Sequence, residues 1–75
     1  MIITKDIYLA SIYIASGVEY LYADKADIRH QEFVFKEGGV DTEKVKSEYI
    51  NGTLMVNAVA FKEAIQRMKS EIHSS

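Results

Sequence analysis

His30 and Glu32 are the two side chains in this sequence whose types and spacing come nearest to a catalytic arrangement. Two residues apart on a strand, they would lie on one face, where a carboxylate can orient an imidazole for proton transfer or join it in binding a metal. A metal needs further ligands at suitable spacing, but His73 lies at the chain end, and Asp24 and Asp27 lack the glycine and glutamate of a calcium-binding loop. We therefore interpret the pair as surface residues and expect no metal site.

Other catalytic patterns are equally weak in this sequence. A catalytic nucleophile needs an activating base, and no recognisable motif surrounds any of the serines. The pair Gly38-Gly39 lacks the Lys-Ser/Thr that follows in a phosphate-binding loop, and it is more typical of a tight strand-to-helix turn. We expect no catalytic residue, no cofactor and no small-molecule substrate, and therefore a protein that is not an enzyme.

Nucleic-acid binding is the alternative function that the sequence leaves open. A predicted hairpin carries aromatic residues that could stack on bases, and it is flanked by the basic residues Lys25, Arg29 and Lys36. The same aromatic residues are the obvious core of a chain without tryptophan: Tyr20, Tyr22, Phe33 and Phe35. The formal net charge of -2 gives no general attraction to phosphate groups, which makes this the second hypothesis rather than the first.

Length and composition indicate one small ordered domain that needs additional support. A chain of 75 residues buries only about 60% of the surface exposed by its unfolded form. Hydrophobic residues make up 48% of the sequence, which is typical of a folded domain, but without cysteine there can be no disulfides and no thiolate ligands. Self-association is the support that remains. We expect a single domain over residues 1–75 with a frayed end at 73–75, and a cytoplasmic location, because neither an export signal nor a membrane-spanning run is recognisable.

The elements that must position these side chains are separated by the four glycines. We predict an α+β fold in the order α-β-β-α-β-α, in which an antiparallel hairpin and a short third strand pack on helices. Thr4, Asp41 and Asn57 are the predicted helix caps. The predicted elements are a helix from Thr4 to Gly17, a hairpin over 18–37, a helix over 42–50, a strand over 53–56 and a helix over 58–72.

The first helix has almost no polar side, which makes it the central question of the sequence. Its residues Tyr8 and Ile12 lie on the flank opposite its main apolar arc. Either the helix is central, between the sheet and the other helices, or this flank contacts a second copy or another protein. In the hairpin, alternation places Tyr20 and Tyr22 toward the helices and Leu21 and Val34 on the opposite face, together with Glu19, His30 and Glu32.

The chain also resembles a known family. With TKDIYLA at residues 4–10, FVF at 33–35 and NGTLMVN at 51–57 running into the last helix, it is similar to an uncharacterised family of small bacterial, archaeal and phage domains. The resemblance covers nearly the whole length. It implies a compact accessory protein, in some cases of mobile-element origin, and it transfers no activity and no site residue.

These observations favour a non-enzymatic protein-interaction module. We expect it to self-associate or to serve as an accessory subunit, with a phage or mobile-element inhibitor of a host protein as a special case. The predicted partner-binding residues are Tyr8, Ile12, Leu21 and Val34.

Overall fold

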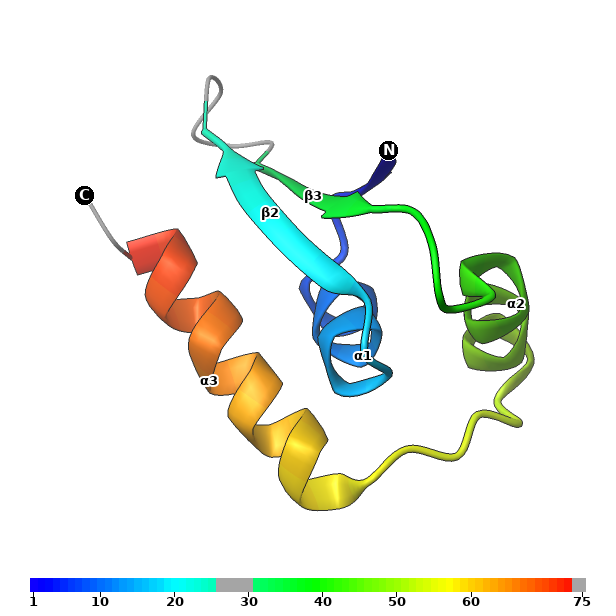
Figure 1. The fold of residues 1–75 in the computed structure, drawn as a ribbon. Helices are drawn as coiled ribbons and strands as arrows, with labels where there is room; N and C mark the ends of the chain where they lie inside the picture. The colour runs from blue at the N-terminus through cyan, green and yellow to red at the C-terminus, as the bar shows by residue number, and fades with distance from the viewer. Residues whose placement is uncertain (26–30, 74–75) are drawn as a thin grey trace.

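The α+β class is confirmed by the computed structural model, which describes residues 1–25 and 31–73 (Figure 1). Within these residues, three helices accompany a three-stranded antiparallel sheet in the order β1-β3-β2. The elements in chain order are β1 (Ile2–Thr4), α1 (Ile7–Ala15), β2 (Glu19–Asp24), β3 (Glu32–Lys36), α2 (Thr42–Asn51) and α3 (Ala58–His73).

The third strand of the sheet is the N-terminal segment β1, and the predicted strand at 53–56 is an extended linker instead. β1 pairs with β3 so that Ile2 lies opposite Phe35 and Thr4 opposite Phe33. The linker runs from α2 to α3 on the side of α1 away from the sheet (Figure 1). Its first two amides, those of Thr53 and Leu54, donate to the Glu48 carbonyl at the end of α2. A strand-forming composition has no effect where no sheet edge lies within reach.

The helix boundaries follow local capping chemistry, with one correction. The N-cap of α1 is Asp6 rather than Thr4, because Thr4 belongs to β1 and the chain must turn before the helix begins. The Asp6 carboxylate accepts from the amides of Tyr8 and Leu9 at 2.8 and 3.3 Å, while Thr4 Oγ1 accepts from the Asp6 amide at 3.1 Å. The predicted caps Asp41 and Asn57 are confirmed: each accepts from an amide three residues further on. The last helix continues through His73, which was predicted to be frayed.

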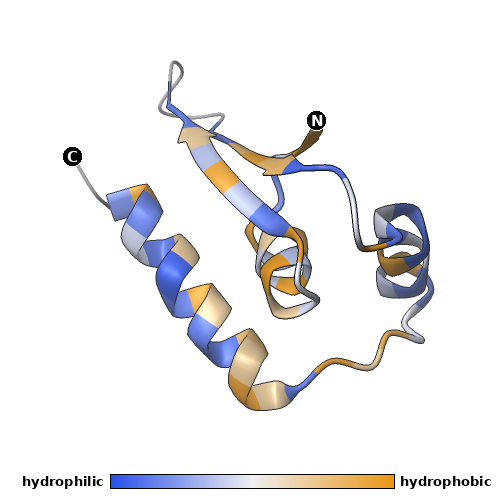
Figure 2. Ribbon diagram, in the orientation of Figure 1, coloured by the Kyte–Doolittle hydropathy of each residue, from blue (hydrophilic) through white to orange (hydrophobic). Residues whose placement is uncertain are grey.

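The core lies between one face of the sheet and the helices. Its buried members are Leu9, Ala10, Tyr13, Val18, Phe33, Phe35 and Met68. Five consecutive residues of α1, from Leu9 to Tyr13, are buried, because the helix packs against the sheet as well as against α2 and α3. Figure 2 shows the corresponding pattern: α1 is itself largely hydrophobic, whereas α2 is largely hydrophilic. The interpretation of α1 as the central helix is confirmed.

The predicted exposed flank of α1 is reduced to one residue. Tyr8 is 54% exposed, but Ile12 is only 4% exposed and lies in the interior of the single chain. Ile12 therefore cannot form a surface flank with Tyr8. The physical reason is that three elements pack around α1, so that residues on nearly all sides of the helix are covered.

A β-bulge in β2 changes which side chains face the helices. Tyr20 pairs with Phe35, but Tyr22 rather than Leu21 pairs with Val34. The extra residue places Leu21 and Tyr22 together on the face away from the helices, while Ala23 returns to the core face. The prediction that Tyr22 faces the helices is therefore wrong.

Candidate functional site

The face of the sheet turned away from the helices is the first candidate site. It is built by one residue of β1, two of the bulged β2 and one of β3: Ile3, Leu21, Tyr22 and Val34. Both Ile3 and Tyr22 are register partners of Val34, so the four side chains form one patch. All three helices lie on the other side (Figure 1), and no element within residues 1–25 and 31–73 covers this face. We call this patch the open face.

At the open face, the outer residues are exposed to solvent and the central residue is buried. Val34 is only 3% exposed, whereas its register partners Ile3 and Tyr22 are 52% and 50% exposed and Leu21 is 40% exposed. A large side chain buries roughly 150–250 Å², so the three exposed ones leave about 300 Å² of mainly apolar surface uncovered. The largest apolar patch on a typical monomer is about 300–600 Å² and is often functional.

Charged residues lie at both ends of the open face. On β3, the residues that alternate with the buried phenylalanines are Glu32, Val34 and Lys36, so an acid and a base flank the apolar centre on one strand. On β2, Glu19 lies opposite Lys36 and Asp24 lies opposite Glu32. The central strand therefore carries opposite charges at its two ends.

The edges of the same sheet are poor docking sites. β1 is three residues long, and β2 is interrupted by the bulge between Tyr20 and Tyr22. Short strands and bulges are the usual means by which an edge avoids pairing with another chain. A partner would thus meet the open face and not an edge.

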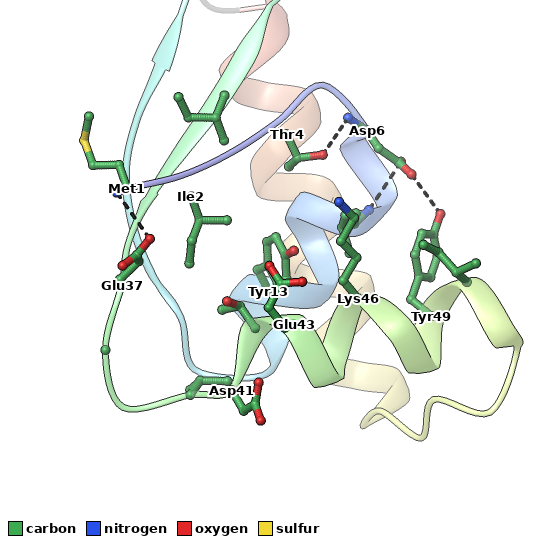
Figure 3. Close-up of a pocket in the computed structure, with 16 residues that line it drawn as sticks. Met1, Ile2, Thr4, Asp6, Tyr13, Glu37, Asp41, Glu43, Lys46 and Tyr49 are labelled. Atoms are coloured by element: carbon green, nitrogen blue, oxygen red, sulfur yellow. Dashed lines mark hydrogen bonds and ion pairs between the residues drawn. The ribbon is translucent and has the colours of Figure 1, made fainter.

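A second candidate site is a pocket of about 760 Å³ between β1, the segment 37–42, α1 and α2 (Figure 3). Ile2, Leu9 and Val40 form apolar parts of its wall. Its polar groups come from Tyr13 on α1 and from several acidic residues, with Lys46 of α2 as the basic side chain. This pocket has the volume of a small-molecule site.

Tyr13 is the most enclosed polar residue of the pocket. It is 3% exposed, and its ring packs edge-on against Phe35 with centroids 5.4 Å apart. Its hydroxyl is directed into the pocket beside Glu43 (Figure 3). The hydroxyl makes no hydrogen bond within residues 1–25 and 31–73, and its oxygen opens to the solvent of the pocket. Burial, followed by the nearby Glu43 carboxylate, raises the pKa of the Tyr13 hydroxyl, so Tyr13 stays neutral.

Tyr49 closes the other end of the pocket. Its hydroxyl donates to Asp6 Oδ2 at 3.0 Å, which joins α2 to the start of α1. The hydrogen bond to the Asp6 carboxylate is the main reason that the pKa of Tyr49 is raised, with burial second. Asp6 thus serves both as the helix cap and as the anchor of α2.

Of the predicted nucleic-acid residues, the two that the structure describes, Lys25 and Lys36, lie apart. Lys36 ends β3 and Lys25 follows β2, at opposite ends of the hairpin, while Arg29 lies outside the described residues, as does His30 of the His30–Glu32 pair. Phe33 and Phe35 are buried in the core and unavailable for stacking. Neither hairpin phenylalanine is therefore free to form a base-stacking platform.

Two contributors to these sites were not predicted. Ile3 joins the open face because the N-terminal residues form a strand, which the apolar run at the start of the chain only suggests. Tyr22 joins it because of the bulge, which leaves no signal in the alternation of residues. In the part of the chain that the structure describes, no three acidic, histidine or cysteine side chains are grouped to hold a metal, and no helix has the length and hydropathy to cross a membrane.

These features define a small α+β domain in which α1 packs on one face of a short sheet, α2 and α3 pack on α1, and an apolar patch lies on the other face. A family described as a domain of unknown function (DUF5659) matches residues 1–74, and the chain belongs to this family. Neither the curated proteins nor the solved structures provide a match to it.

Proposed function

We propose that this protein is a non-enzymatic interaction module that self-associates through the open face. The observation that supports this proposal is the apolar patch around Val34, which the helices leave uncovered in a chain too small for a large core. The occupant is a second copy of the same chain, packed face to face about a two-fold axis. Each copy would cover the patch of the other.

The charge pattern of β3 suits such an arrangement. A two-fold contact uses the same surface on both copies, so the surface must be complementary to itself. When two β3 strands cross antiparallel over Val34, Glu32 of each copy meets Lys36 of the other. An acid and a base at opposite ends of one strand therefore become two intermolecular pairs.

The available area is adequate for a reversible dimer. A standard interface buries about 800 Å² on each side, of which somewhat over half is apolar. The open face supplies about 300 Å² of exposed large side chains, and the charged rim supplies polar area around it. The same packing places Glu19 opposite Asp24 of the second copy at the outer edge, where solvent screens the repulsion. We therefore expect weak, concentration-dependent association.

Sedimentation equilibrium over a series from low micromolar to low millimolar protein tests the proposal. We expect the wild type to dimerise and Tyr22→Lys to remain monomeric, because the substitution places a charge on the patch. Tyr8→Lys is the matched control: Tyr8 is exposed to a similar degree, 54% against 50%, but belongs to α1. Circular dichroism checks that both variants are folded.

Charge reversal tests the orientation. Glu32→Lys and Lys36→Glu should each weaken the dimer, and the double variant should restore it because the two ends of β3 are then simply exchanged. A wild type that stays monomeric throughout the series would overturn the proposal. So would a dimer abolished by Tyr8→Lys and retained by Tyr22→Lys.

A further inference from the structure

We propose that the pocket between β1, α1 and α2 binds a guanidinium group, carried by a small molecule or by an arginine side chain of another protein. Ile3 borders both this pocket and the open face, but the two sites are otherwise distinct, because the pocket has no lining residue from β2 or β3. Tyr13 and Glu43 are its central residues, and Asp41 also lines it.

The Tyr13 hydroxyl is the observation that points to a ligand. A ligand that fills the pocket displaces the water at this hydroxyl, and the hydroxyl then needs a partner on the ligand, because a polar group left without one costs free energy. Tyr13 as a whole residue is 3% exposed, yet its hydroxyl opens into the pocket and makes no hydrogen bond within residues 1–25 and 31–73 (Figure 3). Since the hydroxyl oxygen can accept a hydrogen bond, a donor group on a ligand would satisfy it.

The carboxylates of the pocket indicate that this donor is cationic. Four acidic residues line the pocket: Asp6, Glu37, Asp41 and Glu43. Asp6 is occupied by the α1 cap and Tyr49, and Glu37 lies 3.4 Å from the terminal ammonium group. Asp41 uses Oδ1 to cap α2, and Glu43 makes no ion pair with any residue that the structure describes. Glu43 and the second Asp41 oxygen therefore remain available as acceptors.

The arrangement fits a guanidinium better than a metal ion or an anion. No three carboxylates of the described residues come together as metal ligands do, so a compact ion would not be held. A guanidinium carries five donors in one plane and can reach acceptors that lie apart. The apolar wall of Ile2, Leu9 and Val40 can cover the methylene stem that carries such a group.

Lys46 opposes cation binding, so removing its charge should raise the affinity for a cation, whereas removing the charge of Glu43 should lower it. Lys46 lines the pocket on α2, and Figure 3 places it toward the Asp6 end, whereas Glu43 lies beside Tyr13. A bound cation is attracted by Glu43 and repelled by Lys46. Removing these two charges should therefore change the affinity in opposite directions.

Titration of the 15N-labelled protein followed by NMR tests the proposal, with acetyl-arginine amide as the probe and its citrulline analogue as the neutral isostere. We expect the arginine probe to shift the amides around Tyr13 and Glu43, and the citrulline probe to bind at least tenfold more weakly. Methylguanidinium and an acetyl-Gly-Arg-Gly amide peptide distinguish the two sources: binding of the small cation alone indicates a small molecule, and binding of the peptide alone indicates an arginine of a protein.

Variants assign the contacts. Glu43→Gln and Tyr13→Phe should each weaken binding roughly tenfold, as expected for loss of a hydrogen bond to a charged group. Lys46→Gln should strengthen it, and Glu63→Gln, on the exposed face of α3, is the matched control and should leave it unchanged. The proposal is overturned if the citrulline analogue binds as well as the arginine probe, or if no pocket amide shifts at saturating probe. Dimerisation measured on the same samples keeps this outcome distinct from that of the open face.

Discussion

Tyrosine-to-phenylalanine substitutions at Tyr20 and Tyr13 test how much each tyrosine hydroxyl contributes to the free energy of unfolding. The Tyr20 hydroxyl donates to Glu71 Oε1 at 2.8 Å, and its ring lies 5.2 Å from the Arg67 guanidinium carbon and 5.4 Å from the Phe35 ring. Tyr20→Phe keeps the ring contacts and removes only the hydrogen bond that joins β2 to α3. The substitution therefore isolates one contact between the sheet and the last helix.

The expected loss of unfolding free energy in Tyr20→Phe depends on the type of hydrogen bond that is removed and on its exposure to solvent. A hydrogen bond to a charged group contributes about 1.5–3 kcal/mol when well buried. Because Tyr20 and Glu71 are only partly buried, water replaces part of the bond, and we expect a loss of about 1 kcal/mol. At about 0.05–0.15 kcal/mol per residue, the free energy of unfolding of the whole domain is roughly 4–11 kcal/mol. A loss of about 1 kcal/mol from this total lowers Tm by about 4–8 °C.

Tyr13→Phe is the matched control with the opposite expectation. Its hydroxyl has no partner in the described part of the chain, so removing it breaks no hydrogen bond, and its ring contact with Phe35 is retained. We expect a change in unfolding free energy within about 0.5 kcal/mol.

Urea denaturation of the two variants and the wild type measures both effects at one protein concentration, since self-association shifts apparent stability. A double-mutant cycle of Tyr20→Phe with Glu71→Gln should give a coupling of about 1 kcal/mol. If Tyr13→Phe destabilises the protein as much as Tyr20→Phe does, the reasoning about the pocket hydroxyl is refuted.

Two further predictions concern pH and the end of α2. The pKa values of Tyr13, Tyr20 and Tyr49 are all raised in the folded protein. Their contribution to stability is therefore fully present below the unfolded pKa of about 10 and is lost as the pH rises above that value. The urea midpoint should fall as the pH rises above about 10, and it should fall less steeply in Tyr20→Phe. A constant midpoint across that range would contradict this. Gly52→Ala should cost about 1 kcal/mol in thermal unfolding, because φ is +75° there although the added Cβ meets nothing within 4 Å; an unchanged Tm would show that the helix end adjusts.

The sequence by itself determined much of the local structure. Asp41 and Asn57 begin α2 and α3, Gly17 and Gly52 follow α1 and α2 with positive φ, and the apolar spacing in α3 places Met68 in the core. These features depend on hydrogen bonds and side-chain periods within a few residues, which is why the residues alone reveal them. The nearly uniform apolar character of α1 left two interpretations open, a central helix or a helix with a contact flank, and the packing of the sheet, α2 and α3 around it supports the first.

Only the tertiary structure decided which surfaces remain for function. β1 forms the third strand of the sheet, which the segment 53–56 was predicted to form. The bulge in β2 places Tyr22 on the open face. Packing around α1 buries Ile12. The Tyr13 hydroxyl came to face a pocket whose walls are far apart in the sequence. Strand pairing and pocket formation depend on contacts between distant segments, whose relative free energies no local pattern records.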